Sequence, residues 1–169
     1  SIRVSVVGEA TRPGSYTLPS LATAFNALYA CGGPDSIGSM RDIKVIRANK
    51  VVANLDVYSY LFDGVLSENV GLRDGDIIKI EPYVNRVTIS GAVKHPAVFE
   101  TTRNETLQQL VRYAGGFADN AYKLKLTVLR LNATGKTVVD VTDKQLSSFK
   151  LLSGDSCFVS STAINKYDN

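Results

Sequence analysis

The stretch VVGEATRPGSYTL, at Val6–Leu18, recurs later in the chain as ISGAVKHPAVFET, at Ile89–Thr101. The two stretches align without a gap at a separation of 83 residues. The same separation relates further identical or similar residues across half of each copy: Gly8 and Gly91, Pro13 and Pro96, Leu28 and Val111, Gly32 and Gly115, Val45 and Val128, Arg47 and Arg130. Self-similarity at a fixed period indicates two copies of one structural unit.

The alignment continues to the end of each copy with one change of spacing. LRDGDIIKI, beginning at Leu72, matches LLSGDSCFV, beginning at Leu151, at a separation of 79 residues, so the second copy is four residues shorter. Each copy therefore spans about half of the chain. We expect two domains, at residues 1–84 and 85–169.

Each copy has the same order of expected elements. Two short strands with alternating β-formers, at 3–8 and 15–18 or 86–91 and 98–101, flank a proline turn. An amphipathic helix follows, with Ser20 or Asn104 as the expected N-cap and a Gly-Gly pair at its end. Its apolar face is expected at Leu21, Ala24, Phe25 and Leu28 in the first copy and at Leu107, Leu110, Val111 and Ala114 in the second. Two further strands, a short helix at 58–62 or 143–149 and a closing strand complete the copy. The order β-β-α-β-β-(short helix)-β predicts an α+β fold.

These residues resemble a known family. The order is that of the β-grasp, and three motifs are similar to the soluble-ligand-binding β-grasp (SLBB) domain: GxxxxPGxY from Gly8, the helix ending in Gly-Gly, and the closing LxxGDxIxI from Leu72. The second copy departs from the pattern with Ala97 in place of Gly14. Tandem SLBB units about 80 residues apart resemble the C-terminal part of outer-membrane polysaccharide export proteins of the Wza type.

The resemblance implies a function and a location. In that family, subunits stack as rings around a periplasmic conduit for capsule or exopolysaccharide. The chain would then be a non-catalytic, periplasmic part of an outer-membrane-associated protein. Its partners would be the polysaccharide, other subunits of the export ring and the inner-membrane export machinery. SLBB units also occur in cobalamin-binding proteins and respiratory-complex subunits, so a soluble receptor that binds a small glycan or cofactor between the two units is the alternative.

Composition excludes several other classes. A net charge of +3 over 169 residues does not favour nucleic acid, which calls for a concentrated basic patch. Residues 1–84 hold 8 Lys/Arg and 9 Asp/Glu, whereas residues 85–169 hold 11 and 7. A solvated surface is favoured over an anion-binding one as the explanation of this difference. No apolar run approaches the length of a membrane span, so we expect no membrane insertion by these residues.

Residues with catalytic or metal-binding chemistry are few. Cys31 and Cys157 lack metal-ligand spacing, and the RDGD sequence that ends at Asp76 lacks the spaced oxygen ligands of a calcium loop. His95 is the one histidine, and it lies in a proline turn without a recognisable nucleophile motif nearby. We therefore expect no enzyme, no metal site and no cofactor.

A ligand, if one binds, is expected at the two proline turns. The candidate residues are Arg12, Lys94 and His95, with Tyr16 and Phe99 beside them. An aromatic ring can stack on a sugar while a hydroxyl meets water. Core packing is the favoured interpretation for Tyr16, Phe99 and Tyr29, because they occupy positions that also suit a core.

Both ends of the chain coincide with repeat boundaries. Tyr83 and Asn85 precede the second copy, and Tyr167 and Asn169 close the chain at the same mutual spacing. We expect a longer, exported parent protein that continues into a further SLBB-like unit. The fragment itself is expected to be monomeric or weakly associated in dilute solution.

Overall fold

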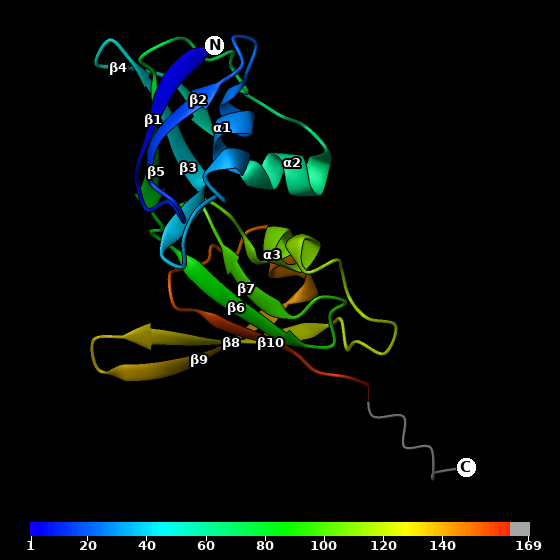
Figure 1. Cartoon of the computed structure of the whole chain (residues 1–169). Coiled ribbons are helices and arrows are strands. Elements are labelled where there is room, and N and C mark those ends of the chain that lie inside the picture. The colour runs from blue at the N-terminus through cyan, green and yellow to red at the C-terminus, as the bar shows by residue number, and fades with distance from the viewer. Residues whose placement is uncertain (163–169) are drawn as a thin grey trace. The chain divides into compact units, whose positions relative to one another are not determined.

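The computed structural model describes residues 1–162. The chain divides into two compact units, one at Ser1–Val84 and one that starts at Asn85. Each unit is a five-stranded sheet with helical elements of its own (Figure 1). Tyr167 and Asn169, on which the expected closing repeat boundary rests, lie outside the described residues.

Unit 1 follows the expected order of elements. Its elements are β1 (Ile2–Gly8), β2 (Gly14–Leu18), α1 (Ala24–Ala30), β3 (Gly38–Arg47), β4 (Lys50–Leu55), α2 (Val57–Asp63) and β5 (Ile77–Pro82). The spatial order of the strands is β2-β1-β5-β3-β4. β1 and β5 pair in parallel, and the other neighbours are antiparallel. The first and last strands of the unit therefore lie side by side inside the sheet.

Unit 2 repeats this arrangement. Its elements are β6 (Arg86–Gly91), β7 (Ala97–Glu100), α3 (Leu107–Tyr113), β8 (Lys125–Asn132), β9 (Gly135–Thr142), the 3₁₀ turn η1 (Asp143–Gln145) and β10 (Ser156–Val159). The strand order is β7-β6-β10-β8-β9, again with the first and last strands parallel. The predicted α+β fold class, two tandem β-grasp units, is confirmed. The expected short helix is a seven-residue helix in unit 1 and a single 3₁₀ turn in unit 2.

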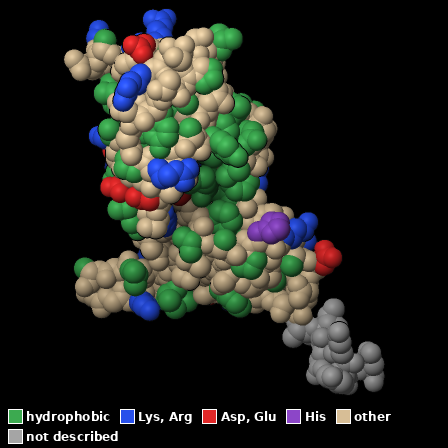
Figure 2. All heavy atoms as spheres, in the orientation of Figure 1, with side chains coloured by type: hydrophobic (Ala, Val, Ile, Leu, Met, Phe, Trp, Pro, Cys, Tyr) green, Lys and Arg blue, Asp and Glu red, His purple; other side chains and the backbone are tan. Residues whose placement is uncertain are grey.

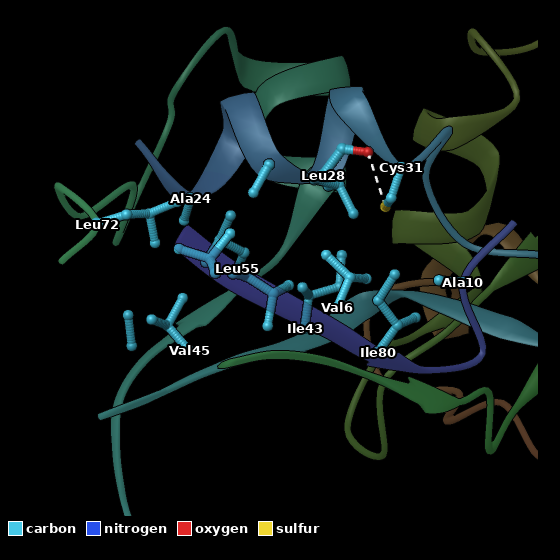
Figure 3. Packing of buried hydrophobic residues seen from close by; sticks show 14 of the residues in the cluster. Val6, Ala10, Ala24, Leu28, Cys31, Ile43, Val45, Leu55, Leu72 and Ile80 are labelled. Carbon is cyan, nitrogen blue, oxygen red and sulfur yellow. Dashed lines mark hydrogen bonds between the residues drawn. The ribbon is translucent and has the colours of Figure 1, made fainter. Parts of the chain in front are cut away.

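The core of unit 1 lies between α1 and one face of the sheet (Figure 3). Alternate residues of the strands point into it, as the period of two along a strand requires. Ile43, Ile78 and Ile80 are fully buried there, and the helix contributes Ala27 and Leu28. A separate cluster around Ile89, Leu110 and Val128 forms the core of unit 2. Each unit therefore buries apolar surface of its own.

The expected helix caps were wrong by three and two residues. The N-caps are Thr23 and Thr106, which are themselves 83 residues apart, rather than Ser20 and Asn104. The backbone N–H of Thr23 donates to Oδ1 of Asn26 at 2.8 Å, and that of Thr106 donates to Oε1 of Gln109 at 2.8 Å. Because the side chain three residues on satisfies an N-terminal N–H, the helix starts at this point.

The late start of α1 also changes the position of Leu21. Leu21 was assigned to the apolar face of the helix, but it precedes the N-cap and is 91% exposed. The residues of the predicted face that lie inside the helix, Ala24, Phe25 and Leu28, do contact the core. The helical period was correct and its starting point was not.

Candidate functional site

The two proline turns that carry the predicted ligand residues are held against the ends of α1 and α3. In unit 1, the backbone N–H of Thr11 donates to the carbonyl of Gly33 at 2.9 Å, and that of Arg12 donates to Cys31 at 3.0 Å. In unit 2, Lys94 donates to Gly116 at 3.1 Å and His95 to Ala114 at 2.8 Å. The turns are therefore fixed by backbone hydrogen bonds at residues of the same repeat register.

Arg12 and His95 are equivalent residues of the two copies, and each side chain lies over a glycine. A Cβ at Gly32 would be 3.1 Å from Nη1 of Arg12, and one at Gly115 would be 2.8 Å from Cδ2 of His95. These glycines have φ of +82° and +81°, a backbone region that glycine occupies without steric cost. The Gly-Gly pair thus ends the helix and also makes room for the side chain of the turn.

Arg12 is held through both its side chain and its backbone carbonyl. Nη2 donates to the carbonyl of Ala30 at 3.3 Å, and the hydroxyl of Tyr16 donates to the carbonyl of Arg12. Within residues 1–162, no carboxylate lies at ion-pair distance from the guanidinium. Arg12 is exposed, so its charge faces solvent from a constrained position.

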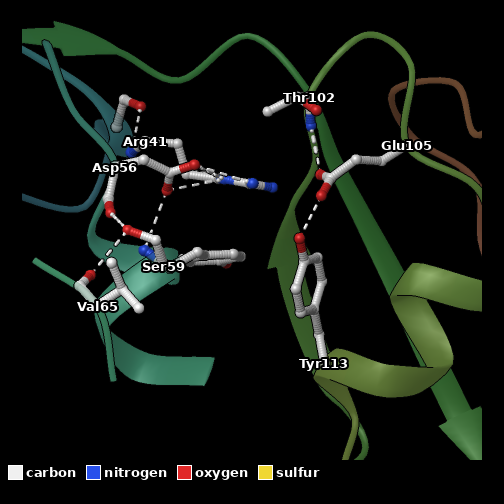
Figure 4. A network of polar contacts seen from close by, with 9 residues as sticks. Arg41, Asp56, Ser59, Val65, Thr102, Glu105 and Tyr113 are labelled. Atoms are coloured by element: carbon white, nitrogen blue, oxygen red, sulfur yellow. Dashed lines mark hydrogen bonds and ion pairs between the residues drawn. The ribbon is translucent and has the colours of Figure 1, made fainter. Parts of the chain in front are cut away.

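Tyr16 and Phe99 contribute first to the cores. Both side chains are half-buried and pack against the core of their own unit. The ring of Phe99 lies 6.3 Å from that of Tyr113, centroid to centroid. The hydroxyl of Tyr113 in turn donates to Oε2 of the buried Glu105, as Figure 4 shows. Core packing therefore holds both rings in place.

Tyr29 differs from the expectation. It was assigned to the core, but its side chain is 81% exposed on α1. Its repeat equivalent is Arg112, a residue type that seldom lies in a core. The arginine at the equivalent position of the second copy therefore indicated that Tyr29 faces solvent.

A pocket of about 430 Å³ opens beside Arg12 in unit 1. It is lined by Arg12, Phe25, Leu28, Tyr29, Gly32, Gly33, Pro34, Met40 and Val57. Of these residues, Arg12 alone was a predicted ligand residue. Phe25, Tyr29 and Met40 come from α1 and β3 and were missed, because helical spacing marks a core face and does not mark a pocket beside it.

Unit 2 has a smaller pocket elsewhere. Its volume is about 300 Å³, and it lies between the ends of β6 and β10, with Ala92, Asn120 and Phe158 among its lining residues. Lys94, His95 and Phe99 are not part of this lining. The five predicted ligand residues therefore lie at two turns or on the strands that follow them, and one of them, Arg12, lines a pocket.

A buried aspartate and a partly exposed arginine form an equivalent ion pair in each unit. In unit 1, Nε and Nη2 of Arg47 contact the two oxygens of Asp76 at 2.9 and 2.7 Å. In unit 2, the same atoms of Arg130 contact Asp155 at 3.1 and 2.9 Å. The aspartates accept further hydrogen bonds from the backbone N–H groups of Arg73 and Leu152, each at 2.8 Å. Such pairs hold the turn before the closing strand.

The environment sets the pKa of these groups. Burial acts to raise the pKa of Asp76, but the hydrogen bonds from Arg47 and from the Arg73 N–H outweigh it, so the pKa lies below its ordinary value. Burial raises the pKa of Cys157 to about 12. The pKa of Cys31 is also raised by burial. Both thiols are therefore protonated near neutral pH, a state in which cysteine is a poor nucleophile.

Within residues 1–162, no group of three or more acidic, histidine or cysteine side chains is placed to hold a metal ion. None of the helices in the same range has the length and hydropathy of a bilayer-crossing segment. The described side chains offer binding surfaces: a constrained cation beside an apolar pocket in unit 1, and a histidine and a lysine at the matching turn of unit 2.

Comparison with known proteins gives consistent matches. Residues 3–57 and 86–141 match the SLBB domain. The chain is 33% identical over 100 residues to the polysialic acid transport protein KpsD of Escherichia coli. It is 31% identical over 120 residues to the EPS I polysaccharide export outer membrane protein EpsA of Ralstonia solanacearum.

These alignments cover 59% and 69% of this chain, respectively. They span 18% of the length of KpsD and 32% of that of EpsA. Each relative therefore has a large part that this chain does not match. The two matched segments together make up more than half of the chain and fall on the same strands and helix in each unit. The chain belongs to the SLBB domain family.

Proposed function

We infer that the chain is a non-catalytic module of a polysaccharide export protein, in which the two SLBB units serve subunit assembly and contact the polymer. The observation that carries this proposal is the similarity to two proteins named for polysialic acid transport and polysaccharide export. The parent protein would be periplasmic and associated with the outer membrane; the name of EpsA describes that relative as an outer membrane protein. Its partners would be further subunits of an export ring and the inner-membrane export machinery.

Open sheet edges support a role in assembly. β4 ends the sheet of unit 1 and carries the exposed Val51 and Val52, and β9 ends that of unit 2 and carries Val138, which is 64% exposed. An edge strand presents unpaired N–H and C=O groups to a neighbouring strand. Apolar side chains along such an edge favour its coverage by another protein surface.

Contact with the polymer is proposed at the proline turns, at Arg12 and Tyr16 in unit 1 and at Lys94, His95 and Phe99 in unit 2.

Deletion of residues 1–169 from the encoding gene, in frame, tests this proposal. The expected result is loss of cell-surface polysaccharide while the remaining export protein is still detected by immunoblot. A Gly71→Ala variant is the matched control, because a Cβ at this glycine meets no atom within 4 Å. Unchanged surface polysaccharide in the deletion strain would contradict the proposed function.

A further inference from the structure

The two units have equivalent cores but differ in the surface around the Gly-Gly turn. Four lining residues of the unit 1 pocket have polar or charged equivalents 83 residues later, so that Arg12, Phe25, Tyr29 and Met40 correspond to His95, Gln108, Arg112 and Lys123. Three of the four change from apolar or aromatic to polar. The pocket is therefore a property of unit 1, and the fold does not require it.

The aromatic side of the pocket is formed by α1 and stabilised by α2. Phe25 is half-buried, and its ring lies 5.2 Å from that of Tyr60 on α2, centroid to centroid. Tyr29 projects from the next turn of α1 with 81% of its surface exposed. Hydrophobic side chains gather over the face of unit 1 that carries these two helices (Figure 2). An aromatic ring that is exposed beside a fixed one provides a platform for a flat apolar ligand face.

α2 itself is held firmly in place. Asp56 accepts a hydrogen bond from the backbone N–H of Tyr58 at 3.0 Å and contacts Arg41 through both carboxylate oxygens, at 3.1 and 3.0 Å (Figure 4). The guanidinium of Arg41 also lies 4.6 Å from the ring centroid of Tyr58. The wall that supports Phe25 is therefore preorganised, which lowers the entropy cost of binding.

Arg12 supplies the charge at the rim. Its backbone and side chain make the three hydrogen bonds described above, to Cys31, Ala30 and Tyr16, and it has no carboxylate partner within residues 1–162. A guanidinium binds a carboxylate through charge-assisted, often bidentate hydrogen bonds. The volume of about 430 Å³ lies within the usual range for small-molecule sites.

We propose that this pocket binds a carboxylated sugar residue of the exported polymer, with the apolar face of the pyranose against Tyr29 and Phe25 and the carboxylate on Arg12. The proposal rests on the proposed function, which makes a glycan the ligand. It adds the location of the binding site and the acidic class of the sugar. A sugar ring has an apolar C–H face and a polar edge, and the pocket has an aromatic wall and a cationic rim. Unit 2 lacks this combination.

Nuclear magnetic resonance of the ¹⁵N-labelled 169-residue chain tests the proposal directly. The chain is titrated with glucuronic acid and N-acetylneuraminic acid, with methyl glucoside as the uncharged probe. The acidic sugars are expected to shift the amide signals of Tyr29, Gly32 and Gly33, and methyl glucoside is expected to bind at least tenfold more weakly, because it cannot form the charged hydrogen bonds. Equal binding of the three sugars, or shifts confined to other residues, would overturn the proposal.

Variants locate the site. Arg12→Ala should weaken binding of the acidic sugars about tenfold. Tyr29→Ala should weaken all three sugars several-fold, and its exposed position makes it tolerant of truncation. Arg112→Ala and Lys50→Ala each remove one positive charge outside the pocket and should leave the affinity unchanged. Two outcomes would overturn the site: controls that weaken binding as much as Arg12→Ala does, or a well-folded Tyr29→Ala protein with full affinity.

The test separates this proposal from the proposed function. If the deletion strain loses its polysaccharide but acidic sugars do not shift the pocket residues, the pocket assignment fails and the export function stands. If the deletion strain exports normally, the export function fails whatever the sugars do. A peptide with an apolar C-terminal residue and a free carboxylate serves as a further probe. Shifts at Tyr29 and Gly33 with this peptide, in the absence of shifts with the sugars, would make the pocket a protein-docking site and overturn the sugar assignment.

Discussion

At the scale of single residues, the buried aspartate before each closing strand is expected to contribute strongly to stability. Asp155 is 1% exposed and accepts hydrogen bonds from Arg130 and from the backbone N–H of Leu152. Asp155→Asn leaves the Arg130 guanidinium, which is 24% exposed, without its counter-ion. We expect a loss of about 3 kcal/mol in the free energy of unfolding of unit 2, the low end for a broken buried pair. Urea denaturation of the variant measures it.

Asp140 is the matched control for this change. It faces Lys125 at 3.6 Å, and both side chains are at least half exposed. Asp140→Asn should change the free energy of unfolding by less than about 0.5 kcal/mol, because an exposed ion pair contributes little. Equal destabilisation by the two variants would mean that burial does not set the strength of the Arg130 pair.

The same pair in unit 1 makes stability depend on pH. The folded-state pKa of Asp76 lies below its ordinary value, so the carboxylate stabilises unit 1 above the unfolded-state pKa of about 4. This contribution is lost as the pH falls through the folded-state pKa. Urea midpoints of unit 1 at pH 7, 5 and 3 should therefore decline more steeply for the wild type than for Asp76→Asn. Parallel declines would show that Asp76 is not the group responsible.

Single residues are also where the sequence was least informative. Ser20 and Thr23 are both good N-caps, and the choice between them depends on whether Asn26 reaches the N–H of Thr23, which is a matter of side-chain geometry. Tyr29 was assigned to the core by its position in the repeat, although its equivalent Arg112 indicated exposure. Arg12 was predicted as a ligand residue and lines a pocket, but the pocket also depends on Met40 and Val57, which come from distant elements.

At the scale of elements, the contact between the first and last strands of each unit depends on one glycine. Gly8 has φ of +84°, and a Cβ there would lie 2.2 Å from the carbonyl oxygen of Ile80. That oxygen accepts a hydrogen bond from the N–H of Glu9 at 2.9 Å. Gly8→Ala therefore combines backbone strain with a steric overlap and should destabilise unit 1 by about 3 kcal/mol or more. Thermal unfolding of the variant measures the effect.

Gly91→Ala should act in the same way on unit 2, since its Cβ would lie 2.1 Å from the carbonyl oxygen of Val159. Gly71→Ala is the control for unit 1, because Gly71 has open space around its Cα and its equivalent in unit 2 is Lys150. A stable Gly8→Ala protein with unchanged pairing of β1 and β5 would refute this account of the repeated glycine.

The elements were largely predictable, because a repeat provides two independent readings of one pattern. For example, a strand was expected at the same place in each copy, and these two strands are β3 and β8. The exception is the segment before the closing strand. It carries Val57, Tyr58 and Phe62 in unit 1 and becomes α2, whereas the shorter and more polar segment of unit 2 forms only η1. The segment of unit 2 is four residues shorter and has fewer apolar side chains to pack against the unit, so a full helix is not stabilised there.

At the scale of the whole molecule, the two cores predict two folding units. The buried residues of unit 1 and unit 2 form separate clusters, each under its own helix. We expect residues 1–84 and 85–169, expressed separately, each to give a cooperative unfolding transition and dispersed amide signals. Domains of about 80 residues commonly fold alone, although their stability is modest. A fragment that stays unfolded until the other is added would show that the two units depend on each other.

The parallel pairing of β1 with β5 has a consequence for synthesis on the ribosome. Residues 5–8 pair with residues 77–80, so the nascent chain must expose nearly all of unit 1 before β1 gains its second neighbour. Contacts of such long sequence separation form late, because a long loop must close first. The same holds for unit 2, because β6 can pair with β10 only after β10 has been synthesised. The sheet of the first unit should therefore be completed while the second unit is still being translated. The sheet of the second unit should be completed only after β10 has been synthesised.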